Sequence, residues 1–312
     1  MRLRPRSRPP MVTAHGHPDL VLQMAGHGSL VQTQTGEWYL AHLIARPYTP
    51  LGRCVLGRET AVQRVEWSQD GWPRVPGGIP HERVGAPRLP QSPFPEEAAR
   101  DEFDALVLGP RWSTLRRAAE AGWLDLRARP SHLRVFGGQS PHGPHTPSLV
   151  ARRLTHRYCS LETVVDCRPQ SFQHLAGITA YYNSRNWHYF YVTRTHEGGV
   201  QLQPLTEDAR RLTAQRSGVV DLDPGMTRIR LRVELEEERA MFSYDVGRGW
   251  QTVPVVLDAT ILSDEYAAHA GVVADRDHPG FTGAFLGLWV MDPAADGFFA
   301  DFDYARYDAG IR

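Results

Sequence analysis

The chain has 312 residues, of which 41% are hydrophobic and 22% are charged, as in an ordinary folded protein. Its 35 basic and 35 acidic side chains balance, so no global field draws in nucleic acid or an anionic membrane. The three cysteines, Cys54, Cys159 and Cys167, contain no C-x-x-C pair, which argues against a disulfide framework or a cysteine zinc site. We expect them to be buried free thiols.

The first ten residues, MRLRPRSRPP, are basic and rich in proline. No apolar stretch of signal-peptide length follows them, and no run approaches the roughly 20 apolar residues that a membrane helix needs. We therefore expect a disordered segment over residues 1–20 and a cytoplasmic protein with no nucleic-acid or membrane partner.

Short alternating segments bounded by Gly, Pro, Asp and Asn are common, whereas long helical periodicity is scarce, which is typical of an all-β protein. Residues 28–33 and 37–43 are predicted as strands joined by a short turn. Two further strands are predicted at 61–67 and 72–75. Such a set is about one blade of a β-propeller, and one blade cannot close a propeller, so residues 21–76 are predicted as an incomplete propeller remnant.

Prolines and glycines crowd the next segment, so residues 77–98 are predicted as a linker between two domains. Strand signals then recur every 10 to 15 residues, and one short helix is predicted near 258–266. The clearest strands lie at 187–193, 228–236, 240–246, 285–291 and 301–307. About a dozen strands predict a two-sheet sandwich of the jelly-roll or concanavalin A-like type over residues 99–309.

Several uncommon sequence runs occur together in the first part of the chain. They are AGHGSLVQTQTGEWYLAHL at 25–43, LGRET at 56–60 and VEWSQDGWPRV at 65–75. This part resembles the last blades of the propeller of glycoside hydrolase family 43 β-xylosidases. The runs AGITAYYN at 176–183 and ADFDYARY at 300–307 resemble the C-terminal sandwich of the same enzymes.

The resemblance implies a five-bladed catalytic propeller followed by a sandwich, and an inverting hydrolase that removes xylose or arabinose from short chains. Inverting hydrolysis needs two carboxyl groups about 6.5–9.5 Å apart, one a general acid and the other a general base. In the family, the Asp, Asp and Glu of the catalytic centre come from the first three blades, which we expect to lie before residue 1. No catalytic residue is therefore assigned in this chain.

Three substrate-binding residues follow from the resemblance. His27 matches the histidine near the propeller axis, Arg58 matches the arginine that reaches the xylose subsite, and Phe281 matches the phenylalanine that closes the pocket. Each has a structural alternative. His27 fits a turn histidine bonded to backbone, Arg58 fits a surface arginine paired with Glu59 or Glu66, and Phe281 fits a core residue.

Acidic residues near both ends of the predicted sandwich suggest structural calcium, with Asp101, Asp301 and Asp303 as hard oxygen ligands. Arginine pairing or solvation is the alternative for these side chains. No other cofactor is expected.

A run of aromatic residues resembles a sugar-stacking platform, although alternation along a strand favours packing for much of it. The residues are Tyr181, Tyr182, Trp187, Tyr189 and Tyr191.

The sequence therefore predicts the C-terminal portion of a β-xylosidase-type glycoside hydrolase that acts on xylo-oligosaccharides or arabinose-containing sugars and is inactive alone. Two alternatives remain. The chain could be a carbohydrate-binding β-sandwich module, or a subunit that complements a separate N-terminal propeller chain or forms a homo-oligomer.

Overall fold

The computed structural model describes residues 10–140, 142–143, 145–269 and 282–310. The chain divides into two compact units, Met1–Glu96 and Glu97–Arg312, which we call unit 1 and unit 2. Nearly all regular structure in the described residues is β-strand, with three short 3-10 turns and a single six-residue helix. The predicted all-β class is confirmed. None of the helices described is long and apolar enough to cross a membrane.

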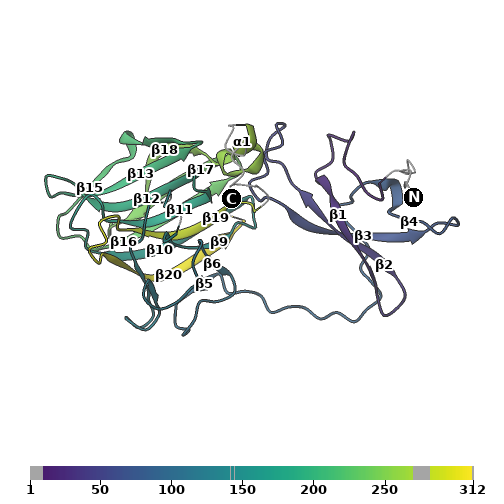
Figure 1. Ribbon diagram of the computed structural model, residues 1–312, viewed down its shortest axis with the longest axis horizontal. Coiled ribbons are helices and arrows are strands. Elements are labelled where there is room, and N and C mark those ends of the chain that lie inside the picture. The colour runs from purple at the N-terminus through teal and green to yellow at the C-terminus, as the bar shows by residue number, and fades with distance from the viewer. Residues whose placement is uncertain (1–9, 141, 144, 270–281, 311–312) are drawn as a thin grey trace. The chain divides into compact units, whose positions relative to one another are not determined.

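Unit 1 contains one four-stranded antiparallel sheet in the order β1-β2-β3-β4 (Figure 1). The strands are β1 (Gln23–Gln32), β2 (Trp38–Ala45), β3 (Glu59–Trp67) and β4 (Pro73–Arg74). The short 3-10 turn η1 (Pro76–Gly78) follows β4. The strand order follows the chain, because each strand pairs with the one that comes next in the sequence.

The packed part of unit 1 begins earlier than the sequence indicates. Val12 is 7% exposed and belongs to a small buried cluster with Leu40, Val65 and Val75. The backbone N–H of Thr13 donates to the carbonyl of Gly78 at 2.9 Å. The basic, proline-rich composition of the N-terminal segment predicts disorder through residue 20. The apolar Val12 side chain is nevertheless buried in the core of unit 1.

The proline-rich segment after β4 also lies against unit 1 in its first half. The Tyr39 hydroxyl donates to the carbonyl of Gly85 at 3.0 Å, and the backbone N–H of Arg88 donates to the Glu37 carboxylate at 2.8 Å. The division between the two units falls later, after Glu96. The first half of the predicted linker, residues 77–88, is therefore held against β2 and Glu37. We call this segment the strap.

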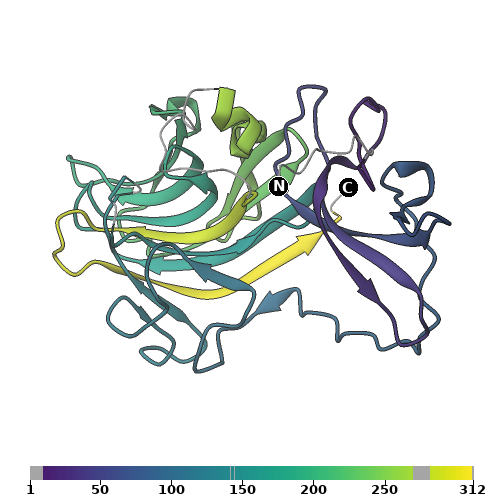
Figure 2. The same ribbon diagram turned by 45° about the vertical axis from the view of Figure 1, so that its right-hand side comes forward.

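Unit 2 is a sandwich of two curved antiparallel sheets (Figures 1 and 2). The first, sheet I, runs in the order β18 (Gln251–Asp258), β17 (Arg239–Asp245), β16 (Arg228–Glu236), β10 (Tyr158–Cys167), β20 (Phe299–Ala309), β8 (Leu133–Phe136) and β7 (Leu124–Asp125), with β5 (Arg100–Asp101) beside β20.

The second sheet, sheet II, runs in the order β14 (Arg211–Ala214), β13 (Val200–Asp208), β12 (Asn186–Arg194), β11 (Leu175–Asn183), β19 (Phe285–Met291), β9 (Ser148–Arg153) and β6 (Trp112–Thr114), with β15 (Val220–Leu222) beside β13. The turns η2 (Arg216–Gly218) and η3 (Ala259–Leu262) and the helix α1 (Asp264–His269) complete the unit. Both η3 and α1 lie where the sequence predicts one short helix.

The inner layer between the sheets follows from strand alternation. In β16, Ile229, Leu231, Val233 and Leu235 are at most 2% exposed, while the arginines and glutamates between them are partly or fully exposed. Phe190 of sheet II stacks on Phe242 of sheet I with ring centroids 5.2 Å apart. Burial of these apolar side chains is the main force that holds the two sheets together.

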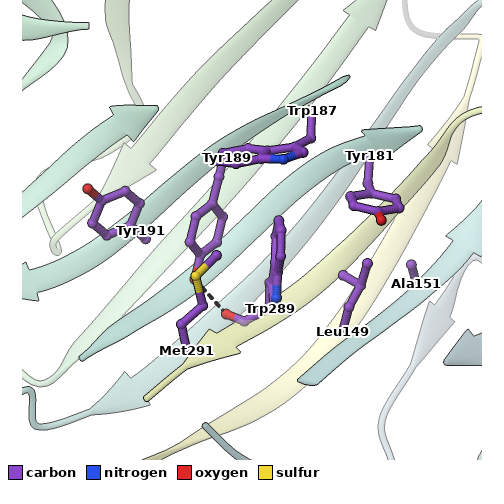
Figure 3. Packing of buried hydrophobic residues seen from close by; sticks show 8 residues of the cluster. All are labelled: Leu149, Ala151, Tyr181, Trp187, Tyr189, Tyr191, Trp289 and Met291. Carbon is purple, nitrogen blue, oxygen red and sulfur yellow. Dashed lines mark hydrogen bonds between the residues drawn. The ribbon is translucent and has the colours of Figure 1, made fainter. Parts of the chain in front are cut away.

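A second apolar layer lies on the far side of sheet II. Because Phe190 faces sheet I, its neighbours Tyr189 and Tyr191 and the next alternate residue, Trp187, point to the opposite face. These side chains are nevertheless 0–6% exposed, and they pack with Trp289 in one cluster (Figure 3). The interpretation of the aromatic run as packing is confirmed, and an open sugar platform is not formed there.

Gly177 lies beneath this layer on the neighbouring strand β11. A Cβ atom at this position would lie 2.7 Å from the Cα of Tyr191 and closer still to the carbonyl oxygen of Phe190. The Tyr189 hydroxyl donates to the Trp289 carbonyl at 2.7 Å, so its ring lies across the intervening strand. Only glycine leaves room for this close approach of backbone and ring.

We predict that Gly177→Ala lowers the free energy of unfolding of unit 2 by about 3 kcal/mol, because backbone atoms cannot move aside as a flexible side chain can. Urea unfolding followed by tryptophan fluorescence measures the change. Gly225→Ala is the matched control, since nothing lies within 4 Å of the position that its methyl group would take, and it should change stability by less than about 0.5 kcal/mol. Equal stability of the two variants would contradict this account of the aromatic layer.

Candidate functional site

His27 lies in a distorted part of β1. The pairing register of β1 with β2 shifts between Gly26 and Ser29, and His27 has the unusual φ of 49°. His27 is exposed. A Cβ atom on Gly28 would lie 2.7 Å from Leu40 Cδ1, so the glycine lets the bulged strand approach β2. The bulge therefore aims His27 away from the packed sheet.

Arg58 follows a buried turn that precedes β3. Cys54, Val55 and Leu56 are at most 1% exposed, and Gly57 closes the turn with φ 69°. The nearby Glu59 carboxylate receives two hydrogen bonds of 2.8 Å from the Arg46 guanidinium. Arg46 is thus a guanidinium partner of Glu59. The buried turn gives Arg58 a rigid base.

Of the three predicted substrate-binding residues, the structure describes two. His27 and Arg58 belong to the segments on either side of β2 and so flank one strand of the same sheet. Phe281 lies outside the described residues. The substrate-binding assignments themselves stay predictions.

The partly buried acids of unit 1 have structural partners. Glu37 is 7% exposed and accepts hydrogen bonds from the Arg88 backbone N–H at 2.8 Å and from the Thr35 hydroxyl at 2.9 Å. The hydrogen bond from Arg88, assisted by Thr35 and by the charges of Arg88 and Arg64, lowers the pKa of Glu37 below its ordinary value. These contacts anchor the segment around Arg88 to Glu37.

The three aspartates predicted as calcium ligands do not come together as one group in the part of the chain that the structure describes. Among the described residues, the single group of three or more potential ligand atoms close enough to share a metal ion is formed by His174, Asp292 and Asp296. The calcium assignment of Asp101, Asp301 and Asp303 stays a prediction, which this geometry does not support.

Each of the three carboxylates is already occupied by protein donors. Asp101 accepts hydrogen bonds from the indole N–H of Trp112 at 2.8 Å and from the Phe103 backbone N–H at 3.0 Å. Asp303 pairs with Arg228. The Arg134 guanidinium donates two hydrogen bonds, of 2.7 and 2.9 Å, to Asp301.

Asp301 is 4% exposed and also contacts Arg129 Nη1 at 3.3 Å. Burial alone would raise the pKa of Asp301, but the hydrogen bonds and charges of Arg134 and Arg129 outweigh burial and lower the pKa below the ordinary 3.8. Arginine, on strands and loops far away in sequence, takes the role that the sequence suggests for calcium.

The His174, Asp292 and Asp296 group is not anticipated from the sequence, although the run Asp292–Asp296 is a visible acidic signal. His174 Nδ1 accepts a hydrogen bond of 3.0 Å from the Gln170 backbone N–H, and Nε2 lies 2.7 Å from Asp296 Oδ1. Since Nδ1 is an acceptor, the ring proton sits on Nε2 and points at Asp296. A metal on Nε2 would require a proton on Nδ1, where the backbone donor already lies, so the geometry disfavours a metal here.

Comparison with known families covers both units. Residues 100–308 match the family described as "Beta xylosidase C-terminal Concanavalin A-like domain". Residues 3–73 match "Glycosyl hydrolases family 43".

Individual relatives agree with the family matches. A "Beta-xylosidase" of Bacillus subtilis is 35% identical over 309 residues, which cover 96% of this chain and 56% of the relative. A "Xylan 1,3-beta-xylosidase" of a Vibrio species is also 35% identical, with the same coverage. The crystal structure of a xylan β-1,4-xylosidase from Bacillus halodurans is 40% identical, with a TM-score of 0.88, and the match covers 96% of this chain and 56% of that one.

An all-β chain in which a family 43 segment precedes a concanavalin A-like sandwich is a chain of the glycoside hydrolase class. The chain belongs to glycoside hydrolase family 43 and corresponds to the C-terminal part of the family's β-xylosidases. It spans little more than half the length of these relatives, at 56%. The predicted resemblance and fold class are confirmed.

We predict that Asp301→Asn destabilises unit 2 by about 3 kcal/mol near pH 7, because it leaves two arginines without their shared carboxylate. The folded-state pKa of Asp301 lies below its unfolded value, so the stabilisation is present above the unfolded pKa and is lost as pH falls through the folded one. Urea unfolding from pH 7 down to pH 3 should show the two proteins converging at the acid end. Asp308→Asn, at a more exposed pair on the same strand, should cost less than about 0.5 kcal/mol.

We also predict that calcium chloride and EDTA leave the melting temperature of the chain unchanged. A site filled at 100 times its Kd would add about 2.7 kcal/mol, which corresponds to a rise of roughly 5–10 °C for a unit of this size. Differential scanning calorimetry detects such a shift easily. A calcium-dependent rise that Asp301→Asn abolishes would restore the calcium assignment.

Proposed function

We propose that this chain is the C-terminal portion of a β-xylosidase-type glycoside hydrolase and that it supplies substrate-binding groups rather than the catalytic carboxylates. The observation that carries the proposal is the pair His27 and Arg58, held on either side of β2 in a segment that matches family 43. In this proposal residues 21–76 are the last propeller blades, 77–98 the linker and 99–309 the sandwich.

The chemistry of inversion supports this division. Two carboxyl groups must face each other across the sugar with room for a water molecule, and each of them contributes roughly 10²–10⁴-fold to the rate. In unit 1, Glu37 anchors the strap and Glu59 is paired with Arg46. We infer that the general acid and base come from polypeptide outside these 312 residues, and that this chain alone does not hydrolyse xylosides.

The roles of the binding residues follow from their chemistry. The Arg58 guanidinium offers planar donors to sugar hydroxyls or holds a neighbouring carboxylate in its ionised form. His27, at the bulge, supports the same site from the other side of β2. Phe281 lies beyond the described residues, and its proposed part is that of an aromatic group for sugar, because aromatic faces stack on sugar C–H groups.

The sheet of unit 1 supports complementation by further blades. Its first strand, β1, pairs on one side only, with β2, in the described residues. Leu30 and Val31 on that strand are 40% and 52% exposed, and Trp67 on β3 is 48% exposed. An open strand edge with apolar side chains favours pairing with another sheet segment.

We predict that the purified chain has no measurable β-xylosidase activity. Co-expression with the N-terminal part of the Bacillus subtilis relative, which is the part that this chain does not match, should restore hydrolysis. In the restored enzyme, His27→Ala and Arg58→Ala should each lower kcat/KM by about 10–100-fold, as expected for lost hydrogen bonds to charged groups. Release of p-nitrophenol from p-nitrophenyl β-xyloside measures all of these activities.

Arg83→Ala is the matched control for Arg58→Ala, because Arg83 is an exposed arginine of the same unit. It should leave kcat/KM unchanged. Hydrolysis by the chain alone, with contaminating enzymes excluded, would contradict the proposal, as would restored activity that is insensitive to both substitutions.

A further inference from the structure

Unit 2 contains a cavity of about 550 Å³ that the proposed function does not use. It is formed by residues of strands β8, β10 and β20, by the loop that precedes β8 and by the loops that follow β10 and β19. Its volume falls within the range of small-molecule sites, which is about 300–1,000 Å³. All of its lining residues lie in the described part of one unit.

One wall of the cavity is a fixed ion-pair network. Arg134 binds Asp301 through two hydrogen bonds, and Arg129 Nη1 bridges Asp166 at 2.8 Å and Asp301 at 3.3 Å. Two arginines and two aspartates thus hold each other in place without a ligand. A wall that is ordered in advance costs a ligand little conformational entropy on binding.

A second wall is positioned by His174, which is 3% exposed. Its ring stacks on Phe298 with centroids 4.5 Å apart and an angle of 3° between the planes. Its Nε2–H points at Asp296 Oδ1, at 2.7 Å. The other oxygen of Asp296 makes no hydrogen bond within the described part of the chain, and the Asp296 side chain is 55% exposed, so an acceptor is held ready at the cavity.

One donor, Arg168, and a second acceptor, the side-chain oxygen of Gln170, add to the Asp296 carboxylate. Arg168 lines the cavity, and its side chain makes no hydrogen bond or ion pair with any residue that the structure describes. The Gln170 side chain donates from Nε2 to the Arg168 carbonyl at 3.1 Å. Its side-chain oxygen, Oε1, remains available as an acceptor. Phe299, 37% exposed, adds an apolar surface at the rim.

The charges of the cavity select the class of ligand. Three arginines, Arg129, Arg134 and Arg168, are balanced by three aspartates, Asp166, Asp296 and Asp301. Because the charges cancel, neither an anion nor a cation gains a strong net attraction. Donors and acceptors beside an apolar surface instead match a neutral molecule with several hydroxyl groups, which can both donate and accept hydrogen bonds.

We propose that this cavity is an accessory binding site for a short neutral oligosaccharide, with Asp296 and Arg168 as the principal hydrogen-bonding groups. The choice of a xylo-oligosaccharide rests on the proposed function, whereas the class of neutral polyhydroxylated ligand rests on the cavity alone. The site would hold substrate on the sandwich without taking part in hydrolysis.

Isothermal titration calorimetry of the whole purified chain with xylotetraose tests the proposal. Saturable binding is expected, with Asp296→Ala and Arg168→Ala each weakening the affinity at least about tenfold. Both residues are exposed, so both variants should fold, and thermal melting checks this. Asp308→Ala, a charge removed from the same sheet outside the cavity, is the control and should bind as the unsubstituted chain does.

Sodium glucuronate and cello-oligosaccharides are titrated in parallel. Tighter binding of glucuronate than of xylotetraose would overturn the neutral-ligand assignment. Binding of cellotetraose alone would support the cavity and count against the xylan-related substrate of the proposed function.

Absence of heat with every sugar, or xylotetraose binding that both substitutions leave intact, would overturn the site. Hydrolysis by the complemented enzyme is a separate readout, so failure of the proposed function and failure of this site are distinguishable.

Discussion

Burial of both faces of the central strands of sheet II is the constraint on which unit 2 depends. Residues of β11, β12 and β19 are buried almost without exception, whichever way they point. One face packs on sheet I through contacts such as the Phe190–Phe242 stack, and the other carries the aromatic layer (Figure 3). In the described part of the chain, sheet II is therefore a middle layer whose central side chains are buried on both faces.

The connection between β8 and β9 contributes to covering the outer side of that layer. Gly138 pairs with Met291 on β19. His142 Nε2 lies 3.4 Å from Oε1 of the buried Glu207 on β13. Burial raises the pKa of Glu207, which His142 and Arg185 oppose with their charges. With the centre of sheet II closed, loops and strand ends are the places left for binding, and the cavity beside His174 lies at such a place.

Much of the fold could be predicted because alternation is a local property. The strand 228–236 and the strand 285–291 coincide with β16 and β19, since one alternates cleanly and the other is apolar throughout. The two- or three-residue strands β5, β6 and β7 were missed because so short a segment has no measurable period. Their pairing is decided by the strands beside them.

The candidate site was less predictable, since it depends on contacts between distant parts of the chain. The family pattern predicts His27 and Arg58 as binding residues, and the structure adds only that the segments that carry them lie on either side of β2. The pairing of Asp301 with Arg134 could not be predicted, because nothing local shows that these two residues, 167 positions apart, lie side by side on paired strands. Acidic residues that are close in sequence indicate a metal site only where no arginine from another part of the chain forms ion pairs with them.

Several of the chain's 35 acidic residues are paired with arginine in unit 2. On the outer face of sheet I, Glu162 pairs with Arg230, Asp303 with Arg228 and Asp301 with Arg134. For Asp301, the hydrogen bonds and charges of Arg134 and Arg129 lower the pKa, whereas a general acid requires a raised pKa. A catalytic carboxyl group needs the opposite surroundings, with burial and few cations, and a propeller axis where several blades converge can provide them. One sheet of four strands contributes side chains from a single direction, so a site of that kind requires neighbouring blades to complete it.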